Sequence, residues 1–319
     1  MTRPHAAVVY NPMKASRDDL RTLVAREQQR LSWTPSRWYP TDSDDSGRRA
    51  AQAAIAGSPA VLLVAGGDGT LRASAEAANN TNIPVAIIPL GTGNLLARNL
   101  GLPLKNLDAS VSAAFSGTSG NIDVGVVQMT RPDGTRDRQV FLVMAGIGLD
   151  AEMAEHTNPT VKRWMGWAAY AAPIAKSVLV NRHFSMRYRI ENGPALSSRA
   201  HTLIIGNCGT LAGRMLLFPE AVIDDGLLDL VLMRPGGRSR WAQIGARLTA
   251  QGIAKRTHLG RRIMRRAPAI QALTYAQGRQ IDLRFETPHT LQLDGDTFGA
   301  VTSARFTVQP SALRICGLL

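Results

Sequence analysis

The sequence has 319 residues, of which 45% are hydrophobic and 19% are charged. This length suits about two folded domains, and the hydrophobic content excludes an intrinsically disordered chain. Lysine and arginine outnumber aspartate and glutamate by 37 to 24, which gives a net charge of +13. Two cysteines, Cys208 and Cys316, cannot build a disulfide scaffold, so a reducing compartment is favoured.

Neither a secretory signal nor a membrane span is predicted. The N-terminus contains no apolar region of signal-peptide length. The longest uncharged apolar run, residues 164–175, has 12 residues, whereas a membrane-spanning helix needs ~20. We therefore expect a soluble, cytoplasmic chain.

The first 125 or so residues alternate short β-branched runs with helical patterns. Strands are predicted at residues 6–10, 33–39, 60–65 and 84–89. Helices are predicted after Ser16, over residues 44–56, and from about Leu71 and Leu95. Strands that alternate with helices predict a parallel sheet covered on both faces.

The pattern changes after about residue 121. Strand-like runs, separated by Gly, Pro and Asn turns, occupy residues 140–145, 184–190, 202–205, 227–233, 280–285 and 302–308. Helical stretches are predicted only at residues 152–180 and 240–266. This succession predicts a mainly antiparallel second domain.

Glycine-rich turns follow two neighbouring strands of the predicted parallel sheet. The first turn is Gly66, Gly67, Asp68, Gly69 and Thr70, and the second is Gly91, Thr92, Gly93 and Asn94. Ligands bind at the carboxyl ends of such strands, and glycines let backbone amides approach a phosphate. The sequence therefore predicts one phosphate-binding crevice, onto which Asn11 after the first strand would also open.

The aspartate in the first turn needs its own explanation. A carboxylate in an anion-binding turn suggests either a metal ion on the phosphate or a group aimed at an attacking hydroxyl. The alternative is a tight turn in which Asp68 only caps the next helix. The turn is neither a Walker A sequence, because no Lys follows its last Gly, nor a GxGxxG sequence.

The excess positive charge is concentrated in one segment. No acidic residue occurs between Asp229 and Asp282, where 11 basic residues leave 26 basic against 24 acidic residues for the rest of the chain. The densest run contains Arg261, Arg262, Arg265 and Arg266. Such a segment predicts a surface that meets polyanions, with anionic lipid as one candidate. The alternative is an ordinary solvated helix face.

Together these motifs resemble the diacylglycerol kinase catalytic domain family, the bacterial lipid kinases whose relatives include sphingosine and ceramide kinases. The resemblance is carried in family order by residues 66–70, 91–103, 121–125, 146–151, 205–207, 219–221, 224–229 and 293–296. The first turn alone is shared with NAD kinases and, loosely, with phosphofructokinases. The motifs of the second half favour the lipid kinases.

The resemblance implies two domains with the active site between them. A phosphofructokinase-like α/β nucleotide-binding domain would span residues 1–122 with a return at 309–319, and a mainly antiparallel β-sandwich lipid-substrate domain would span residues 123–308. ATP would bind Asn11, Thr41, Gly66, Gly67, Asp68, Gly69, Thr70, Gly91, Thr92 and Asn94. A structural Mg²⁺ would be held by the Asp225 carboxylate and the backbone carbonyls of Val222 and Leu227. Asp123 would join the substrate or metal network.

The sequence departs from the family pattern at three places. Arg72 and Ala73 replace the usual Asn-Glu, and Leu95 replaces an Asp. The late Asp-Gly-Glu motif, whose Glu is the proposed proton acceptor, reads Asp294-Gly295-Asp296. The shorter Asp296 reaches ~1.5 Å less far, yet it can still act as a base. Asp296 and Asp68 are therefore the predicted catalytic residues.

The leading hypothesis is an ATP-dependent lipid kinase that acts in phospholipid biosynthesis, with diacylglycerol as the first candidate substrate and phosphatidic acid as its product. Trp164, Trp167 and Tyr170 would line a lipid groove, unless they form a packed core helix. Peripheral binding to the inner face of an anionic membrane is expected, and the oligomeric state, including a homodimer, stays open. The alternatives are a soluble NAD kinase-like enzyme and a catalytically inactive or polyanion-binding relative. Nucleic acid binding is disfavoured because no stacking platform accompanies the charge.

Overall fold

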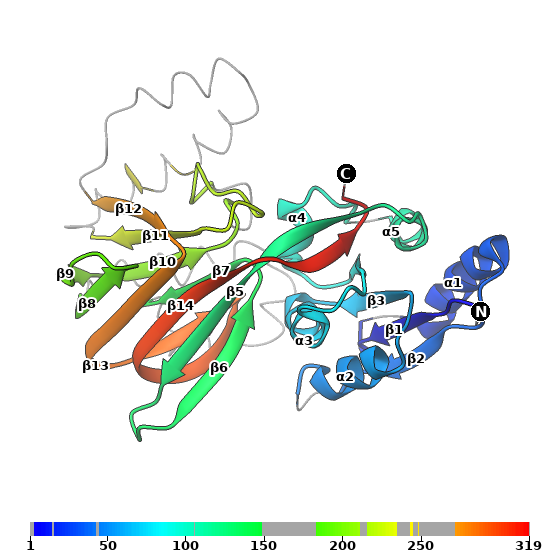
Figure 1. Cartoon of the computed structure of the whole chain (residues 1–319), viewed down its shortest axis with the longest axis horizontal. Coiled ribbons are helices and arrows are strands. Elements are labelled where there is room, and N and C mark those ends of the chain that lie inside the picture. Colours follow the sequence, from blue (N-terminus) through cyan, green and yellow to red (C-terminus); the bar gives the residue numbers. More distant parts are fainter. Residues whose placement is uncertain are drawn as a thin grey trace, which may run out of the picture. The chain divides into compact units, whose positions relative to one another are not determined.

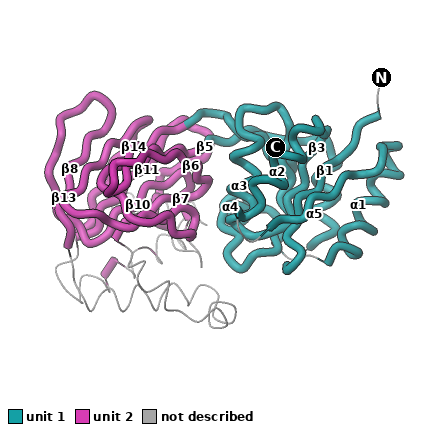
Figure 2. Tube along the Cα trace, turned by 90° about the horizontal axis from the view of Figure 1, so that it is seen from below, with its two compact units in different colours: residues 1–124, 309–319 teal, residues 125–308 magenta. Residues whose placement is uncertain are grey.

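The computed structural model describes residues 3–14, 16–42, 45–104, 106–148, 183–210, 216–234, 243–244, 248 and 272–318. The chain divides into two compact units (Figures 1 and 2). Unit 1 comprises residues 1–124 and 309–319, and unit 2 comprises residues 125–308. The first boundary therefore falls at residue 124, whereas the sequence suggested 122.

Unit 1 is an α/β domain (Figure 1). Its elements are β1 (Ala6–Tyr10), α1 (Arg17–Leu31), β2 (Arg37–Pro40), α2 (Arg48–Ala56), β3 (Val61–Gly66), α3 (Asp68–Ala78), β4 (Val85–Pro89), α4 (Leu95–Asn99), α5 (Leu107–Ala114), the start of β5 (Ser119–Thr130) and the end of β14 (Asp296–Cys316). The strand order is β2-β1-β3-β4-β14, and each of these pairs is parallel. Every residue of β1, β3 and β4 is buried, so the predicted parallel sheet is confirmed.

Local capping explains where helix α1 begins and ends. The Ser16 side chain accepts a hydrogen bond from the Asp19 amide at 3.4 Å, as predicted for an N-cap. At the other end Ser32 adopts a left-handed conformation, and the Trp33 amide bonds to the Gln28 carbonyl at 2.9 Å. The prediction that a strand starts at residue 33 was wrong because this amide closes the helix.

Unit 2 is built from antiparallel strands. Its elements are the rest of β5, β6 (Arg136–Phe141), β7 (Met144–Ile147), β8 (Phe184–Ile190), β9 (Leu196–Ala200), β10 (Thr202–Gly206), β11 (Leu228–Met233), β12 (Leu273–Gly278), β13 (Gln280–Leu293) and the start of β14. The main order is β12-β11-β10-β7-β13-β14, with β8 and β9 added on β13 and with β5 and β6 added on β14. Alternate side chains of these strands form a large apolar core, and a second apolar cluster lies on the other face of β10 and β11. The predicted, mainly antiparallel second domain is confirmed.

One predicted strand of unit 2 is in fact two. Residues 140–145 were expected to form a single strand, but β6 ends at Phe141 and β7 begins at Met144. The amides of Leu142 and Val143 point to the carboxylate of Asp294 and not to a neighbouring strand. The predicted helices at 152–180 and 240–266 lie outside the described residues, except for 243–244 and 248.

Candidate functional site: the glycine-rich turns and an aspartate hairpin

The first glycine-rich turn connects β3 to α3. Gly67 stands at the helix N-cap in an extended conformation, and α3 begins at Asp68, three residues earlier than predicted. A Cβ on Gly66 would lie 2.8 Å from the Thr70 Cβ, so Thr70 packs against the turn and is only 6% exposed. The Thr70 side chain therefore shapes the loop from within, whereas its contact with ATP stays a prediction.

The two glycine-rich turns touch each other. A Cβ on Gly91 would lie 2.7 Å from the Cα of Gly67, and a Cβ on Gly93 would lie 2.7 Å from Oδ2 of Asp68. Glycine at residue 91 permits the backbones of the two turns to approach each other, and glycine at residue 93 leaves room for the Asp68 carboxylate. The structure thus brings together two of the sequence-predicted ATP-binding segments at the carboxyl ends of β3 and β4, where the exposed Thr92 also lies.

Asp68 links one turn to the helix that follows the other. Its Oδ1 accepts a hydrogen bond from the Leu95 amide at 2.6 Å, at the first residue of α4. Leu95 stands where the family usually has an Asp, and its side chain is only 7% exposed. In this chain the residue contributes its backbone amide to Asp68. Asp68 therefore caps α4, the neighbouring helix, in addition to any role in chemistry.

Asn94 holds the second turn closed. Its backbone is left-handed, with φ 48°, a conformation that Asn tolerates better than most residues. Its side-chain oxygen accepts from the Gly91 amide at 2.9 Å, and its amide group donates to the Gly91 carbonyl at 2.8 Å. These bonds within the turn explain why an Asn is needed here, and direct contact with ATP stays a prediction.

Asn11 and Thr41 follow β1 and β2 on the same edge of the sheet. The Asn11 amide donates to the Ala65 carbonyl at 2.9 Å, and its side chain accepts from the Met13 amide at 2.9 Å. The Thr41 amide donates to the Tyr10 carbonyl at 2.8 Å. Both residues therefore lie at strand carboxyl ends, as the sequence predicted for Asn11.

Lys14 lies beside the first glycine-rich turn and was not among the residues expected from the sequence. Its amide bonds to the Asn11 carbonyl at 3.0 Å, which folds the segment after β1 back toward the glycines. As a result the Lys14 Nζ lies 2.8 Å from where a Cβ of Gly67 would stand. An exposed ammonium group beside a turn of glycines suits an anionic ligand, although a single lysine after Asn-Pro carries no sequence signal that would have revealed it.

In unit 2 the Asp294-Gly295-Asp296 motif forms a hairpin turn. Leu293 pairs with Asp296, and the two residues between them have φ of 49° and 93°, as in the tight turns that favour Asp-Gly. Asp294 is 6% exposed, and its carboxylate accepts hydrogen bonds from the amides of Leu142, Val143 and Met144 at 2.9, 2.8 and 3.0 Å. Asp296 is exposed at the start of β14. The buried aspartate anchors the turn that presents the predicted base.

The predicted metal ligands lie on the turn before β11. Asp225 is exposed, and its Oδ1 accepts from the Leu227 amide at 2.9 Å. Burial raises the pKa of nearby Asp229 to about 6. A hydrogen bond from Gln277 lowers this pKa, whereas the negative charges of Asp225 and Glu220 raise it. A carboxylate and backbone carbonyls in this negative surrounding fit a hard cation such as Mg²⁺. No group of three or more His, Cys, Asp or Glu side chains able to hold a metal occurs in the part of the chain that the structure describes.

Asp123 lies fully buried in unit 1. Its Oδ1 accepts from the Ser311 amide at 2.7 Å, which ties β5 to β14. Ser311 has a φ of 51°, so this bond also stabilises an unusual backbone conformation. The contact gives Asp123 a structural role, and its participation in a substrate or metal network stays a prediction.

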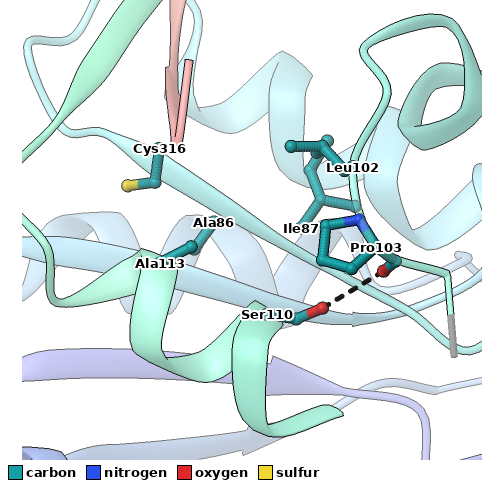
Figure 3. Close-up of a pocket in the computed structure, with 7 residues that line it drawn as sticks. All are labelled: Ala86, Ile87, Leu102, Pro103, Ser110, Ala113 and Cys316. Carbon is teal, nitrogen blue, oxygen red and sulfur yellow. Dashed lines mark hydrogen bonds between the residues drawn. The ribbon is translucent and has the colours of Figure 1, made fainter. Parts of the chain in front are cut away.

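A small, mainly apolar pocket lies elsewhere in unit 1 (Figure 3). It is lined by Ala86, Ile87, Leu102, Pro103, Ser110, Ala113 and Cys316. The Ser110 hydroxyl donates to the Pro103 carbonyl at 3.3 Å, and burial raises the pKa of the Cys316 thiol to about 11. The pocket contains none of the sequence-predicted site residues, so it is not the predicted ATP site.

Several predicted residues lie outside the described part of the chain. They are the groove candidates Trp164, Trp167 and Tyr170 and the docking candidates Arg261, Arg262, Arg265 and Arg266. Among the helices that the structure describes, none is both long and apolar enough to cross a membrane.

Comparison with known proteins identifies both halves of the chain. Residues 5–127 match the diacylglycerol kinase catalytic domain, and residues 143–317 match the YegS C-terminal NAD kinase beta sandwich-like domain. A diacylglycerol kinase crystal structure from Bacillus anthracis str. Sterne has a TM-score of 0.66 at 16% identity, covering 99% of this chain and 97% of its own. A second structure from that organism reaches a TM-score of 0.74 at 19% identity, covering 99% and 96%. These structures confirm the predicted combination of domains.

Several similar curated proteins come from bacteria. A "Probable lipid kinase YegS-like" protein of Pseudomonas aeruginosa is 27% identical over 328 residues, 99% of this chain and 95% of the relative. Its namesake in Pseudomonas syringae pv. syringae is 30% identical over 239 residues, 73% of this chain and 72% of the relative. A diacylglycerol kinase of Mycobacterium tuberculosis is 30% identical over 200 residues, 62% of each. The chain therefore belongs to the family of YegS-like lipid kinases.

Proposed function

We propose that the chain transfers the γ-phosphoryl group of ATP to a lipid hydroxyl, with diacylglycerol as substrate and phosphatidic acid as product. Family membership supports a lipid kinase, and the Mycobacterium tuberculosis relative is named a diacylglycerol kinase. The name of that relative favours diacylglycerol over a sphingoid base or another glycerolipid alcohol.

The observation that carries the proposal is the contact between the two glycine-rich turns. A Cβ on Gly91 is excluded because it would stand 2.7 Å from the Gly67 Cα, and Gly67 is itself the N-cap of α3. The free amides at a helix N-terminus bind anions. Lys14 adds a cation beside Gly67. Backbone donors and a lysine at strand carboxyl ends suit a polyphosphate, because phosphoryl transfer depends mainly on positioning and charge neutralisation.

The chemistry requires a proton acceptor. The substrate hydroxyl oxygen forms a bond to the γ-phosphorus while the bond to the departing ADP oxygen breaks, and the hydroxyl proton passes to the Asp296 carboxylate. Its exposure at the start of β14 leaves Asp296 accessible to solvent and substrate. The hairpin anchored by Asp294 fixes the backbone from which Asp296 projects.

Mg²⁺ is the expected cofactor. Asp225 with the carbonyls of Val222 and Leu227 would hold a structural ion, and a bound divalent cation would offset negative charge around Asp229. Within the predicted ATP-binding turns, the Asp68 carboxylate would bind a cation on the phosphates. Its Oδ1 accepts the hydrogen bond from the Leu95 amide, so Oδ2 would be the cation ligand.

The test is to incubate the purified chain with γ-labelled ATP, Mg²⁺ and, in separate reactions, diacylglycerol, sphingosine and NAD. Label in phosphatidic acid is expected. The variant Asp296→Asn should lower kcat by at least about 100-fold, as expected for loss of a general base. Asp133→Asn, which also neutralises an exposed aspartate of unit 2, is the matched control and should keep wild-type activity.

A second candidate has one specific observation in its favour. The domain matched by residues 143–317 is described as NAD kinase beta sandwich-like. Label in NADP with none in any lipid would refute the lipid kinase proposal, and label in no product with bound ATP retained would identify an inactive relative.

A further inference from the structure

Arginines gather on one face of the unit 2 sheet. Along β8, Phe184 and Met186 are buried in the core, so the alternate positions Ser185, Arg187 and Arg189 lie on the opposite face. Strand β8 lies between β9 and β13, and β14 pairs with the other edge of β13 (Figure 1). The four strands therefore share this face. We call it the arginine face, and its basic residues are Arg187, Arg189, Arg199, Arg284 and Arg305.

Strand register places these arginines next to one another. Arg187 of β8 lies directly opposite Arg284 of β13. Arg199 of β9 lies opposite Ser185, the neighbour of Arg187 on this face of β8. Arg189 and Arg305 lie on either side of Asp282, to which they form ion pairs at 3.0 and 2.6 Å. Even with the exposed Glu286 counted as a second acid, the arginines exceed the acids of this face by three.

The pair of Arg187 and Arg284 brings two like charges directly opposite each other. Like charges directly opposite on a sheet destabilise it. Both residues are exposed, and among the described residues neither side chain has an ion pair or hydrogen bond. The pair therefore costs stability in the free protein, and an anionic partner would turn this repulsion into binding energy.

We propose that the arginine face docks the chain onto the surface of an anionic lipid bilayer. The face extends over four adjacent strands, about 5 Å apart, so it presents charge in two dimensions to a broad surface. The outward positions between the arginines are polar, namely Ser185, Ser197, Gln280, Ser303 and Thr307, and none is aromatic. A single-stranded nucleic acid would need stacking side chains there. The inference rests on the proposed function, because a lipid kinase must reach a substrate held in a membrane.

This surface differs from the basic segment found in the sequence. The residues between Asp229 and Asp282 that carry the linear charge excess include Arg261 and Arg262, which lie outside the described residues. The arginines of the face alternate with core residues along their strands and are balanced in the sequence by acids elsewhere. Only the strand register reveals their concentration.

The experiment measures co-flotation of the full chain with vesicles of phosphatidylcholine containing 30 mol% phosphatidylglycerol. The double variant Arg187→Gln with Arg284→Gln is compared with Arg17→Gln plus Arg21→Gln, which removes the same charge from exposed positions of α1. Each arginine near an anionic surface contributes about 5-fold to affinity, so the face variant should bind about 25-fold more weakly. The α1 variant should bind as the wild type does, and vesicles of phosphatidylcholine alone should bind none of the three.

Two results would overturn the proposal. The first is equal loss of vesicle binding in the face variant and the α1 variant, or no loss in either. The second is a selective loss of duplex DNA binding by the face variant while its vesicle binding is unchanged. Thermal melting excludes misfolding as the cause, because removal of a like-charge pair should leave Tm unchanged or slightly higher.

Failure of the proposed function can be told apart from failure of docking. In mixed micelles of diacylglycerol and a non-ionic detergent, the face variant should phosphorylate lipid at the wild-type rate, since its substituted residues lie outside the predicted ATP-binding turns. Wild-type protein that labels no lipid in micelles refutes the kinase proposal, whatever the vesicles show. Wild-type activity in micelles with unchanged vesicle binding in the face variant refutes docking alone.

Discussion

Replacement of Asp294 by Asn tests how the hairpin of unit 2 is held. Asn fits the left-handed backbone at this position as well as Asp does, so the turn conformation is not itself perturbed. What changes is the acceptor set. In the native protein Oδ1 accepts from the amides of Val143 and Met144, and Oδ2 accepts from the amide of Leu142.

The cost can be worked out from these three bonds. The Asn side-chain oxygen can replace Oδ1. The NH2 group in the place of Oδ2 is a donor, so the Leu142 amide would lose its acceptor. An unsatisfied buried donor costs about 1–3 kcal/mol, and the two remaining bonds each lose about 1 kcal/mol of charge assistance. The free energy of unfolding of unit 2 should therefore fall by about 3–5 kcal/mol, which corresponds to roughly 10 °C in Tm for a unit of this size.

Differential scanning calorimetry of the full chain measures this effect. Asp296→Asn is the matched control because it makes the same chemical change two residues away on an exposed side chain. We expect the control to keep the wild-type Tm and lose kinase activity, and Asp294→Asn to lower Tm. If Asp294→Asn melted at the wild-type temperature, the three amide contacts would not stabilise the fold, and the reasoning would be wrong.

Three further predictions concern the other sites. Gly91→Ala should weaken ATP binding more than tenfold, because the new Cβ would stand 2.7 Å from the Cα of Gly67. Equilibrium titration measures the affinity, and a variant that binds ATP as tightly as the wild type would show that the turns need not touch. Asp229→Asn should raise Tm at pH 8 and leave it unchanged near pH 3.5. The raised pKa of about 6 means that the stability of the native protein falls as the pH rises from about 4 to 6, and Asn does not ionise. An equal gain in Tm at both pH values would exclude ionisation of Asp229 as the cause. Asp225→Asn should abolish any rise in Tm on addition of Mg²⁺, and a rise equal to that of the wild type would place the ion elsewhere.

Features set by short stretches of sequence were predictable. The apolar runs of β3 and β4, the Ser16 cap and the glycine-rich turns depend on neighbours within a few residues, and the structure has each of them. The break between β6 and β7 was not predictable in this way. Its cause is the carboxylate of Asp294, about 150 residues further along the chain, which takes the amides of residues 142 and 143 out of strand pairing.

Two components of the candidate surfaces also depend on the fold. Lys14 reaches Gly67 only because the chain reverses after β1, and no residue pattern marks that reversal as a ligand site. The arginine face arises from the register of four strands, whereas a linear count of charge shows only the segment between Asp229 and Asp282. Local motifs located the glycine-rich turns, but the cation beside them and the charge pattern of a sheet face require three-dimensional pairing.

The return of β14 to unit 1 has a consequence for biosynthesis. Ile315 pairs with Val85, so β14 completes a sheet whose strands β1 to β4 are synthesised well before it. Until then β4 has an unpaired, apolar edge, which is the kind of edge that promotes aggregation of nascent chains. Removal of residues 310–319, which include none of the predicted catalytic residues, should therefore reduce the yield of folded protein more than it reduces the activity of the molecules that do fold.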